Sequence, residues 1–163
     1  MFQYISDNIR KKEKQKLMQN MNGEGIISAD GRTAFLIDSS QKVLYIADNN
    51  NHLHKYWKDD ILEVTIEKVD EKGHKHSLIS TMLLYEIGKM IDKKNDLHEV
   101  LPRIATEKEI ITTQMIFLRI YVKDFNTPYF DLIFYKKGLL ANKKECYELA
   151  IRWHALINVL KHQ

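Results

Sequence analysis

Residues 142–163 constrain the fold more than any other feature of this sequence. Asn142 stands three residues before Glu145, as in a capping box, and Lys161 and His162 suit the negative end of a helix dipole. Apolar residues recur between these ends at spacings of three and four, on one wide helical face: Cys146, Leu149, Ala150, Trp153, Leu156, Ile157 and Leu160. A helix with such a face must cover an apolar surface formed elsewhere in the chain.

Alternating patterns predict the strands that this helix would cover. The clearest is a hairpin from Met115 to Lys136, where side chains alternate on both sides of the turn Asn126-Thr127-Pro128. Residues 61–69 alternate in the same way, which is typical of a half-buried antiparallel strand. Its buried face is expected to carry Leu62, Val64 and Ile66.

Three shorter β-prone runs precede these strands, at residues 33–38, 42–48 and 52–57. Asn49-Asn50-Asn51 separates the last two runs, and asparagine tolerates the left-handed backbone that tight turns require. A further turn, Asp70-Glu71-Lys72-Gly73, follows residues 61–69 and supplies a glycine where a positive φ is expected. All of these strands would be antiparallel.

Residues 1–25 depart from this pattern because lysine and arginine crowd the segment. We expect a basic N-terminal helical segment, capped by Ser6 or Asp7 and ended by Gly23 and Gly25. The favoured interpretation is a solvated helix that packs lightly on the domain, because long lysine stems often lie on ordinary surfaces. The alternative is a basic arm that binds acidic lipid or nucleic acid.

Residues 26–163 are predicted to form a single domain of the α+β class, mainly β. Its strands, six or seven in number, would make a small antiparallel barrel or two orthogonal sheets, which the helix at residues 142–163 would cap. Residues 78–109 mix an apolar run with polar residues and Pro102, so a partly helical insertion is expected there.

The composition of the 163 residues is that of a globular protein, with 44% apolar and 29% charged residues. The net charge of +3 is too small to indicate nucleic acid by itself. Cys146 is the only cysteine, so an intramolecular disulfide is excluded and a cytoplasmic location is expected. No stretch reaches the roughly 20 apolar residues of a membrane span, so no transmembrane segment is expected.

Three parts of the chain resemble an uncharacterised group of bacterial and phage proteins, associated with phages or mobile elements. They are residues 55–62 with the following strand and its turn at Gly73, the hairpin of residues 115–136, and residues 150–160, which carry the pair Trp153-His154. The resemblance implies a β domain like the pleckstrin-homology (PH) domain, closed by a C-terminal Trp-His helix. It implies no activity, because none is established for the group.

The resemblance also bears on membrane contact. PH relatives that grip phosphoinositides use a basic first hairpin loop, whereas residues 38–42 carry one cation and one anion. Many members have a glycine-rich apolar insert where this chain has residues 78–109, which are nearly without glycine. Peripheral membrane contact is therefore not expected.

Histidine is the best candidate for chemistry. His52 and His54 share one face of a strand, and so do His74 and His76, because side-chain direction repeats every two residues. If the two strands approach, up to four imidazoles could converge on Zn²⁺ or Ni²⁺, as in a metal-dependent enzyme. We find no carboxylate or cysteine at a matching spacing, and Lys75 would repel a cation. The favoured interpretation is therefore polar positions near turns, with no metal or other cofactor.

No catalytic set emerges from the sequence. It contains no glycine-rich phosphate loop, no serine nucleophile elbow and no HExxH motif. Trp153 and Cys146 lie on the apolar helical face, where a core role is expected. The chain is therefore predicted not to be an enzyme.

The function predicted from the sequence is that of a non-catalytic binding or adaptor module. It would recognise a protein or peptide through an exposed strand edge or an aromatic face around Tyr56 and Trp57, with Lys55 and Lys58 beside them. A homodimer through the same edge is a further expectation. The alternative is binding of single-stranded nucleic acid or another acidic surface, in which these aromatic rings would stack on bases.

Overall fold

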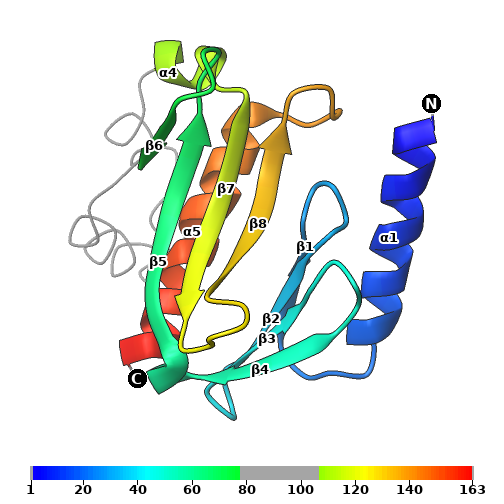
Figure 1. Cartoon of the computed structure of the whole chain (residues 1–163), viewed down its shortest axis with the longest axis vertical. Coiled ribbons are helices and arrows are strands. Elements are labelled where there is room, and N and C mark those ends of the chain that lie inside the picture. The colour runs from blue at the N-terminus through cyan, green and yellow to red at the C-terminus, as the bar shows by residue number, and fades with distance from the viewer. Residues whose placement is uncertain (1, 78–106, 163) are drawn as a thin grey trace.

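The computed structural model describes residues 2–77 and 107–162, which form two antiparallel sheets and the α-helices around them (Figure 1). The first sheet has the order β1-β2-β3-β4 and consists of β1 (Glu24–Ile27), β2 (Ala34–Asp38), β3 (Val43–Ala47) and β4 (Leu53–Trp57). The second has the order β6-β5-β7-β8 and consists of β5 (Ile61–Val69), β6 (Lys75–Ser77), β7 (Met115–Val122) and β8 (Tyr129–Lys136). The helices are α1 (Phe2–Met18), α4 (Glu107–Thr112) and α5 (Lys143–His162), and a 3₁₀ turn, η1 (Lys58–Asp60), joins the sheets.

The predicted α+β class with antiparallel sheets is confirmed, and so are most of the predicted strands. The hairpin expected at residues 115–136 is β7 and β8, and the run at residues 61–69 is β5. The shorter runs become β2, β3 and β4, each beginning one residue later than the sequence indicates.

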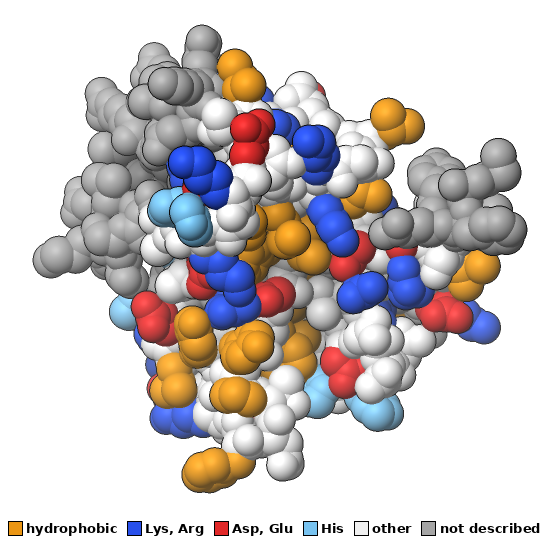
Figure 2. Space-filling view, turned by 45° about the horizontal axis from the view of Figure 1, so that its top comes forward, with side chains coloured by type: hydrophobic (Ala, Val, Ile, Leu, Met, Phe, Trp, Pro, Cys, Tyr) orange, Lys and Arg blue, Asp and Glu red, His pale blue; other side chains and the backbone are white. Residues whose placement is uncertain are grey.

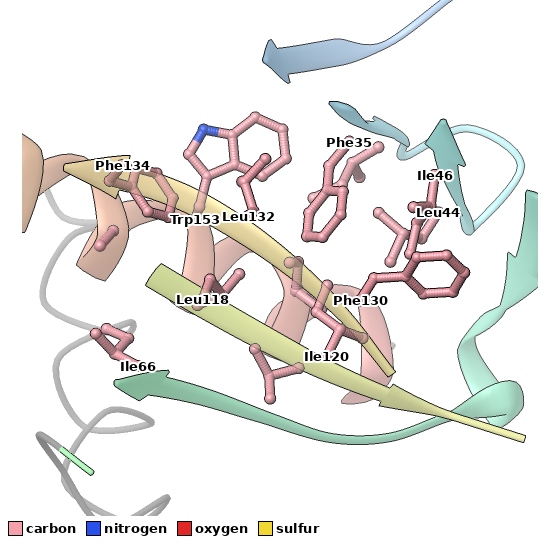
Figure 3. Close-up of a cluster of buried hydrophobic side chains, with 14 of the residues drawn as sticks. Phe35, Leu44, Ile46, Ile66, Leu118, Ile120, Phe130, Leu132, Phe134 and Trp153 are labelled. Atoms are coloured by element: carbon pink, nitrogen blue, oxygen red, sulfur yellow. The ribbon is translucent and has the colours of Figure 1, made fainter. Parts of the chain in front are cut away.

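One hydrophobic core lies between the two sheets and α5 (Figure 3). Phe35 and Ile46 enter it from the first sheet, and Leu118 and Phe130 enter it from the second. Trp153 of α5 is 1% exposed and belongs to the same cluster. Truncating a fully buried aromatic side chain usually costs about 3–5 kcal/mol, so Trp153 is a main attachment of α5 to the sheets.

A closed barrel is not formed, which corrects one of the two architectures that the sequence suggested. Each sheet has four strands among the described residues, more in total than the six or seven expected, and no strand pairing joins the sheets there. Instead, the loop between β1 and β2 contacts the outer edge of β8. Ala29 donates its N–H to the Ile133 carbonyl at 2.6 Å, and the Thr33 hydroxyl donates to the Asp131 carbonyl at 2.7 Å. A loop, and not a strand, covers this edge.

The C-terminal helix is confirmed with the cap that the sequence indicates. The Asn142 Oδ1 atom accepts a hydrogen bond from the Lys144 N–H at 3.0 Å, and the Asn142 amide donates to Glu145 at 3.1 Å. Leu149 departs from the predicted face, because it is 37% exposed. Tyr147, which the apolar pattern did not include, is fully buried, and its hydroxyl lies 3.0 Å from the Thr113 hydroxyl.

Leu62 is a second correction. Its side chain is 50% exposed, whereas Ile61, Val64 and Ile66 are buried. The pairing of β5 with β7 shifts register between Ile61 and Glu63. Such an irregularity interrupts the strict two-residue alternation on which the sequence prediction depended.

The N-terminal segment differs from expectation at both ends of its helix. Helix α1 already begins at Phe2, so Ser6 and Asp7 lie inside it and do not cap it, and Asp7 forms an ion pair with Arg10. It ends at Met18, and residues 24–27 form β1, a strand that the glycine-containing sequence did not reveal.

The predicted insertion at residues 78–109 is described only at its end, where α4 begins at Glu107; residues 78–106 lie outside the described part of the chain. None of the helices formed by residues 2–77 and 107–162 combines the length and the apolar character needed to cross a membrane.

Candidate functional site

Strand β4 forms an edge of the first sheet and exposes a row of side chains. Its only partner among the described strands is β3. Leu53 and Trp57 are 44% and 49% exposed, and Lys55 between them is exposed too. These three residues share one face because side-chain direction alternates along a strand. The sequence-predicted Lys55 and Trp57 are thus neighbours on a free surface.

The row on β4 is held together by a cation and an aromatic ring. The Lys55 Nζ atom lies 4.5 Å from the centre of the Trp57 ring and 5.8 Å from the centre of the Tyr45 ring on β3. An ammonium group over a ring face is attracted by its quadrupole, by roughly 0.5–1 kcal/mol at an exposed site. The Trp57 N–H donates to the Asp60 Oδ2 atom at 3.0 Å, which fixes the step from β4 into η1, where Lys58 lies.

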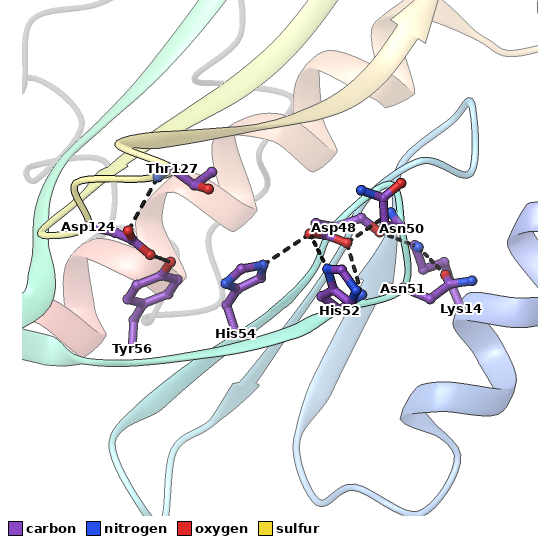
Figure 4. A network of polar contacts seen from close by, with 9 residues as sticks. All are labelled: Lys14, Asp48, Asn50, Asn51, His52, His54, Tyr56, Asp124 and Thr127. Carbon is purple, nitrogen blue, oxygen red and sulfur yellow. Dashed lines mark hydrogen bonds and ion pairs between the residues drawn. The ribbon is translucent and has the colours of Figure 1, made fainter.

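Tyr56 is the member of the predicted set that this surface does not contain. It points to the other face of β4, is 6% exposed, and lies beside Phe130 at a ring distance of 5.9 Å. Its hydroxyl donates to the Asp124 Oδ2 atom at 3.1 Å (Figure 4). Burial, reinforced by Asp124, raises the pKa of Tyr56, so the phenol stays protonated. Tyr56 therefore belongs to the core, with a polar anchor at its tip.

The first histidine pair surrounds Asp48 in the turn between β3 and β4. The His54 Nε2 atom lies 3.2 Å from the Asp48 Oδ2 atom, and the His52 Nδ1 atom lies 3.5 Å from it (Figure 4). The Asp48 Oδ1 atom accepts the N–H groups of Asn50 and His52, each at 2.9 Å. Burial alone would raise the pKa of Asp48, but these hydrogen bonds hold it below its usual value.

A lysine of α1 closes this first turn. Lys14 is 2% exposed, and its ammonium donates to the Asp48 carbonyl and to the Asn51 side chain (Figure 4). Burial lowers the pKa of Lys14, and Asp48 and Glu13 oppose that effect. The sequence showed Lys14 only as one of several lysines, so this contact was missed. Helix α1 is therefore attached to the domain by a buried charge.

The second histidine pair surrounds Asp70 in the turn between β5 and β6. The His76 Nε2 and His74 Nδ1 atoms lie 3.2 Å and 3.6 Å from the Asp70 Oδ2 atom. The two turns belong to different sheets, and histidine side chains lie at separate places on the surface in Figure 2. The four-histidine site considered from the sequence is therefore not formed. The structure instead places a carboxylate beside each pair, Asp48 or Asp70, which stands four residues before the first histidine and was not predicted as a ligand.

The remaining candidates have structural surroundings. Burial, with Glu145 nearby, raises the pKa of the Cys146 thiol, which disfavours the reactive thiolate. His154 is fully buried, and its Nε2–H donates to the Val64 carbonyl at 3.0 Å. Burial lowers the pKa of His154 to about 4, so the ring is neutral. Neither residue lies beside a second reactive group of the kind that a catalytic site requires among the described residues.

A groove between α1 and β1 was also missed from the sequence. Met18 and Met21 lie on its helix side, and Gly25 and Leu36 lie on its sheet side. Lys12 and Lys16 also line it. The groove depends on the docking of α1, of which the sequence predicted only a light packing on the domain.

Comparison of this chain with models of known protein families, with curated proteins and with solved structures gives no match.

Proposed function

We propose that this protein is a non-catalytic binding module that takes up an extended segment of a partner protein along the free edge of β4. The observation that carries the proposal is the combination, on one short strand, of an edge that no other described strand pairs with and an exposed row of Leu53, Lys55 and Trp57. A peptide that adds to a sheet edge gains main-chain hydrogen bonds, and its side chains gain specificity from the neighbouring surface.

The hydrogen-bond pattern of β4 supports addition of a strand. The Asp48 N–H donates to the His52 carbonyl, so His52 directs its backbone toward β3. In an antiparallel pair this direction alternates, so Leu53 and Lys55 direct their N–H and C=O groups to the open edge. The Trp57 N–H also points away from β3, but Asp60 already accepts it. The open edge therefore ends at Lys55, and a partner strand would be short.

Charge favours a partner other than a second copy of β4. In a symmetrical antiparallel dimer centred on this strand, Lys55 would face Lys55 of the other copy, and like charges directly opposite destabilise a sheet. An acidic residue at that place would pair with Lys55, while apolar residues on each side of it would contact Leu53 and Trp57. The partner segment is expected to alternate as apolar, acidic and apolar along one face.

The other exposed aromatic surface competes less well for such a partner. On β7 and β8, Arg119 lies 4.3 Å over the Tyr129 ring and forms two hydrogen bonds of 2.7 and 2.8 Å with Asp131. Its charge is therefore already paired within the protein. Lys55 has two aromatic neighbours and lies close enough to Asp38 to help lower the pKa of that carboxyl, but among the described residues it forms no bidentate ion pair of this kind.

Selection from a displayed library of random peptides tests this function. The full chain should enrich peptides with the alternating apolar and acidic pattern, and Trp57→Ala should weaken the binding of an enriched peptide about tenfold or more, as at an interface hot spot. Phe125→Ala is the matched control, because Phe125 is fully exposed but lies in the β7–β8 turn. Absence of an enriched pattern, or equal binding by the wild type and Trp57→Ala, would contradict the proposal.

Two outcomes of further titrations would favour the alternatives. Binding of a single-stranded oligonucleotide that weakens steeply with salt would indicate nucleic-acid binding, in which Trp57 stacks on a base beside Lys55 and Lys58. Concentration-dependent dimerisation that Lys55→Glu alters would indicate self-association through β4. Trp57 is half exposed and Trp153 is buried, so a change in tryptophan emission would come mainly from the proposed surface.

We also propose that the fold is PH-like. Support comes from the order of the elements, in which a four-stranded meander leads into a second antiparallel sheet and a final helix packs on the shared core. An experimental structure in which the two sheets cross at nearly a right angle would support this assignment, and aligned sheets would contradict it.

We also propose that the protein is located in the cytoplasm. Cys146 is the only cysteine of the sequence and is a free thiol, as expected in a reducing compartment. Fractionation of cells that express the full chain tests the location, and recovery outside the cytoplasm would contradict it.

A further inference from the structure

The two histidine turns share a sequence pattern and a backbone. Each has an aspartate followed by histidines four and six residues later: Asp48, His52 and His54 in the first, and Asp70, His74 and His76 in the second. In both turns the aspartate carbonyl accepts an N–H from three residues later, and the aspartate N–H donates to the carbonyl four residues later. The local sequence therefore builds the same carboxylate and imidazole arrangement twice.

In the second turn, three possible ligand atoms converge. The Asp70 Oδ2, His74 Nδ1 and His76 Nε2 atoms all lie within 4.8 Å of one another. Asp70 is separated from the two imidazole nitrogens by 3.6 and 3.2 Å. Ligand atoms placed about 2.0–2.1 Å from a tetrahedral Zn²⁺ ion are about 3.3–3.4 Å apart, so the two separations from Asp70 need little adjustment.

The carboxylate of this turn is held in place by two hydrogen bonds. The Asp70 Oδ1 atom accepts the N–H groups of Lys72 and His74 at 2.8 and 2.9 Å, which leaves the Oδ2 atom facing the imidazoles. A ligand held by second contacts needs less reorganisation when it binds an ion.

The first turn differs from the second in the clustering of its ligand atoms and in its contacts with the rest of the protein. Its three polar side chains do not form a comparable cluster of ligand atoms, and the Lys14 ammonium already lies against its carbonyl and Asn51. His54 also packs on Phe130, at a ring distance of 5.1 Å. The His54 side chain is only 25% exposed, although His52 is 74% exposed, whereas His74 and His76 of the second turn are 67% and 49% exposed.

We propose that Asp70, His74 and His76 bind one divalent first-row transition-metal ion, with Zn²⁺ as the test ion. Two imidazoles and a carboxylate suit this class of ion, and three protein ligands leave a further position for water or for a group from another molecule. The site goes beyond the proposed peptide binding, which uses β4 of the other sheet and does not depend on metal.

Two lysines near the site, Lys75 and Lys68, differ in how their charges would affect metal binding. Lys75, which the sequence analysis counted against a metal, extends to the other face of β6, where its Nζ atom lies 5.9 Å from the Phe117 ring. Lys68 is the residue paired with His76 across β5 and β6, so its charge is on the ligand face. It would weaken binding without blocking a ligand atom.

Calorimetric titration of the untagged full chain with Zn²⁺ tests the site. We expect one ion per chain. Asp70→Asn, whose amide oxygen can still accept the two turn hydrogen bonds, should lower the affinity about tenfold or more, and His76→Ala should do the same. His52→Ala is the matched control in the first turn and should leave the affinity unchanged. Circular dichroism would verify that each variant is folded.

The outcomes separate this proposal from its competitors. Absence of Zn²⁺ binding by the folded wild type would overturn it, and so would equal binding by the wild type, Asp70→Asn and His76→Ala. A loss of affinity in His52→Ala as large as that in His76→Ala would place the ion elsewhere and overturn it as well. Titration with Co²⁺ in place of Zn²⁺ gives a second readout. The visible absorption of bound Co²⁺ should indicate nitrogen and oxygen ligands in the wild type, and it should be lost or altered in His76→Ala. Peptide binding should be the same with and without Zn²⁺, so failure of one proposal leaves the other intact.

Discussion

The turn between β3 and β4 and the turn between β5 and β6 have the same backbone but different surroundings. Both place a residue with positive φ directly before the first histidine, namely Asn51 at 64° and Gly73 at 79°. Both direct an aspartate toward two imidazoles. In the first turn a lysine from a distant helix completes the hydrogen bonds, whereas the second turn presents its ligand atoms to solvent.

This difference separates what local sequence decides from what packing decides. The spacing from aspartate to histidine produces the same turn twice, because the side-chain oxygen satisfies two backbone N–H groups in each. Helix α1 contacts only the first of the two turns, through Lys14, and the second turn has no such contact among the described residues. The first turn is therefore structural, and the second is the one available to a ligand.

Gly31→Ala should have the largest effect, because it removes α1 from the first turn. Gly31 has a φ of 71°, and a Cβ atom there would lie 2.8 Å from the Asp7 carbonyl oxygen of α1. Backbone strain of about 1–2 kcal/mol and overpacking of about 1–3 kcal/mol predict a loss of about 2–5 kcal/mol in the free energy of unfolding. Urea denaturation measures this loss.

Gly73→Ala is the matched control in the second turn. Its φ is 79°, yet nothing lies within 4 Å of the added Cβ atom. Only the backbone strain should remain, about 1–2 kcal/mol. Similar losses for the two alanine variants would mean that α1 does not press on the domain at Gly31.

Acid should reveal a contribution of the core to the pH dependence of stability above pH 4. His154 has a pKa of about 4 in the folded protein, against 6.5 when unfolded. Its contribution is fully present above pH 6.5 and is lost as the pH falls toward 4, which amounts to about 3 kcal/mol. Asp48 and Asp70 have lowered pKa values, so both turns keep their carboxylates ionised through this range.

Urea denaturation at several pH values measures this loss. His154→Gln keeps a side-chain amide that can donate to the Val64 carbonyl but cannot titrate, so its stability should change much less between pH 6.5 and 4. A variant with the full pH dependence of the wild type would assign the effect to other groups.

The regular elements were predictable because their signals are local. The apolar spacing of residues 143–162 and the alternation of residues 115–136 each report one buried face, and the structure contains both elements. Predictions failed where the alternation itself is interrupted, as at Leu62, or where a strand is short and contains glycine, as in β1. A register shift is decided by the partner strand, which the sequence of β5 alone does not describe.

The candidate site was predictable only in part, for a similar reason. Exposure of Trp57 and Lys55 followed from alternation along β4, and the same alternation should have placed Tyr56 inside. Asp48 and Asp70 were not predicted as ligands because only the two-residue spacing of a strand was considered. A turn also brings together residues that are four and six positions apart. The burial of Lys14 depends on the docking of α1, a long-range contact that leaves no periodic signal.

Lys14→Met tests whether the buried ammonium makes the two turns different. The methionine keeps most of the apolar stem but removes the donor for the Asp48 carbonyl and for Asn51. Hydrogen bonds to charged groups contribute about 1.5–3 kcal/mol, so a loss of about 2 kcal/mol is expected. Lys72→Met in the second turn is the control, because Lys72 is exposed, and it should change stability by no more than about 0.5 kcal/mol. Equal effects would remove the distinction between the turns.

Substitution of the two residues with positive φ, Asn51→Gly and Gly73→Asn, should have the smallest effect on the free energy of unfolding. Asn51→Gly keeps the left-handed backbone but removes the acceptor for Lys14 and the amide that donates to Glu13 at 3.3 Å. A loss of about 1 kcal/mol is expected, about half of that for Lys14→Met, because one of the two hydrogen bonds of the ammonium is lost. Gly73→Asn adds a side chain in open space at a backbone that asparagine tolerates, so its effect should be near zero. In the Lys14→Met background most of the cost of Asn51→Gly should disappear, because the acceptor has lost its donor. An undiminished cost there would show that Asn51 stabilises the turn through its own backbone, and that the lysine of α1 adds nothing to it.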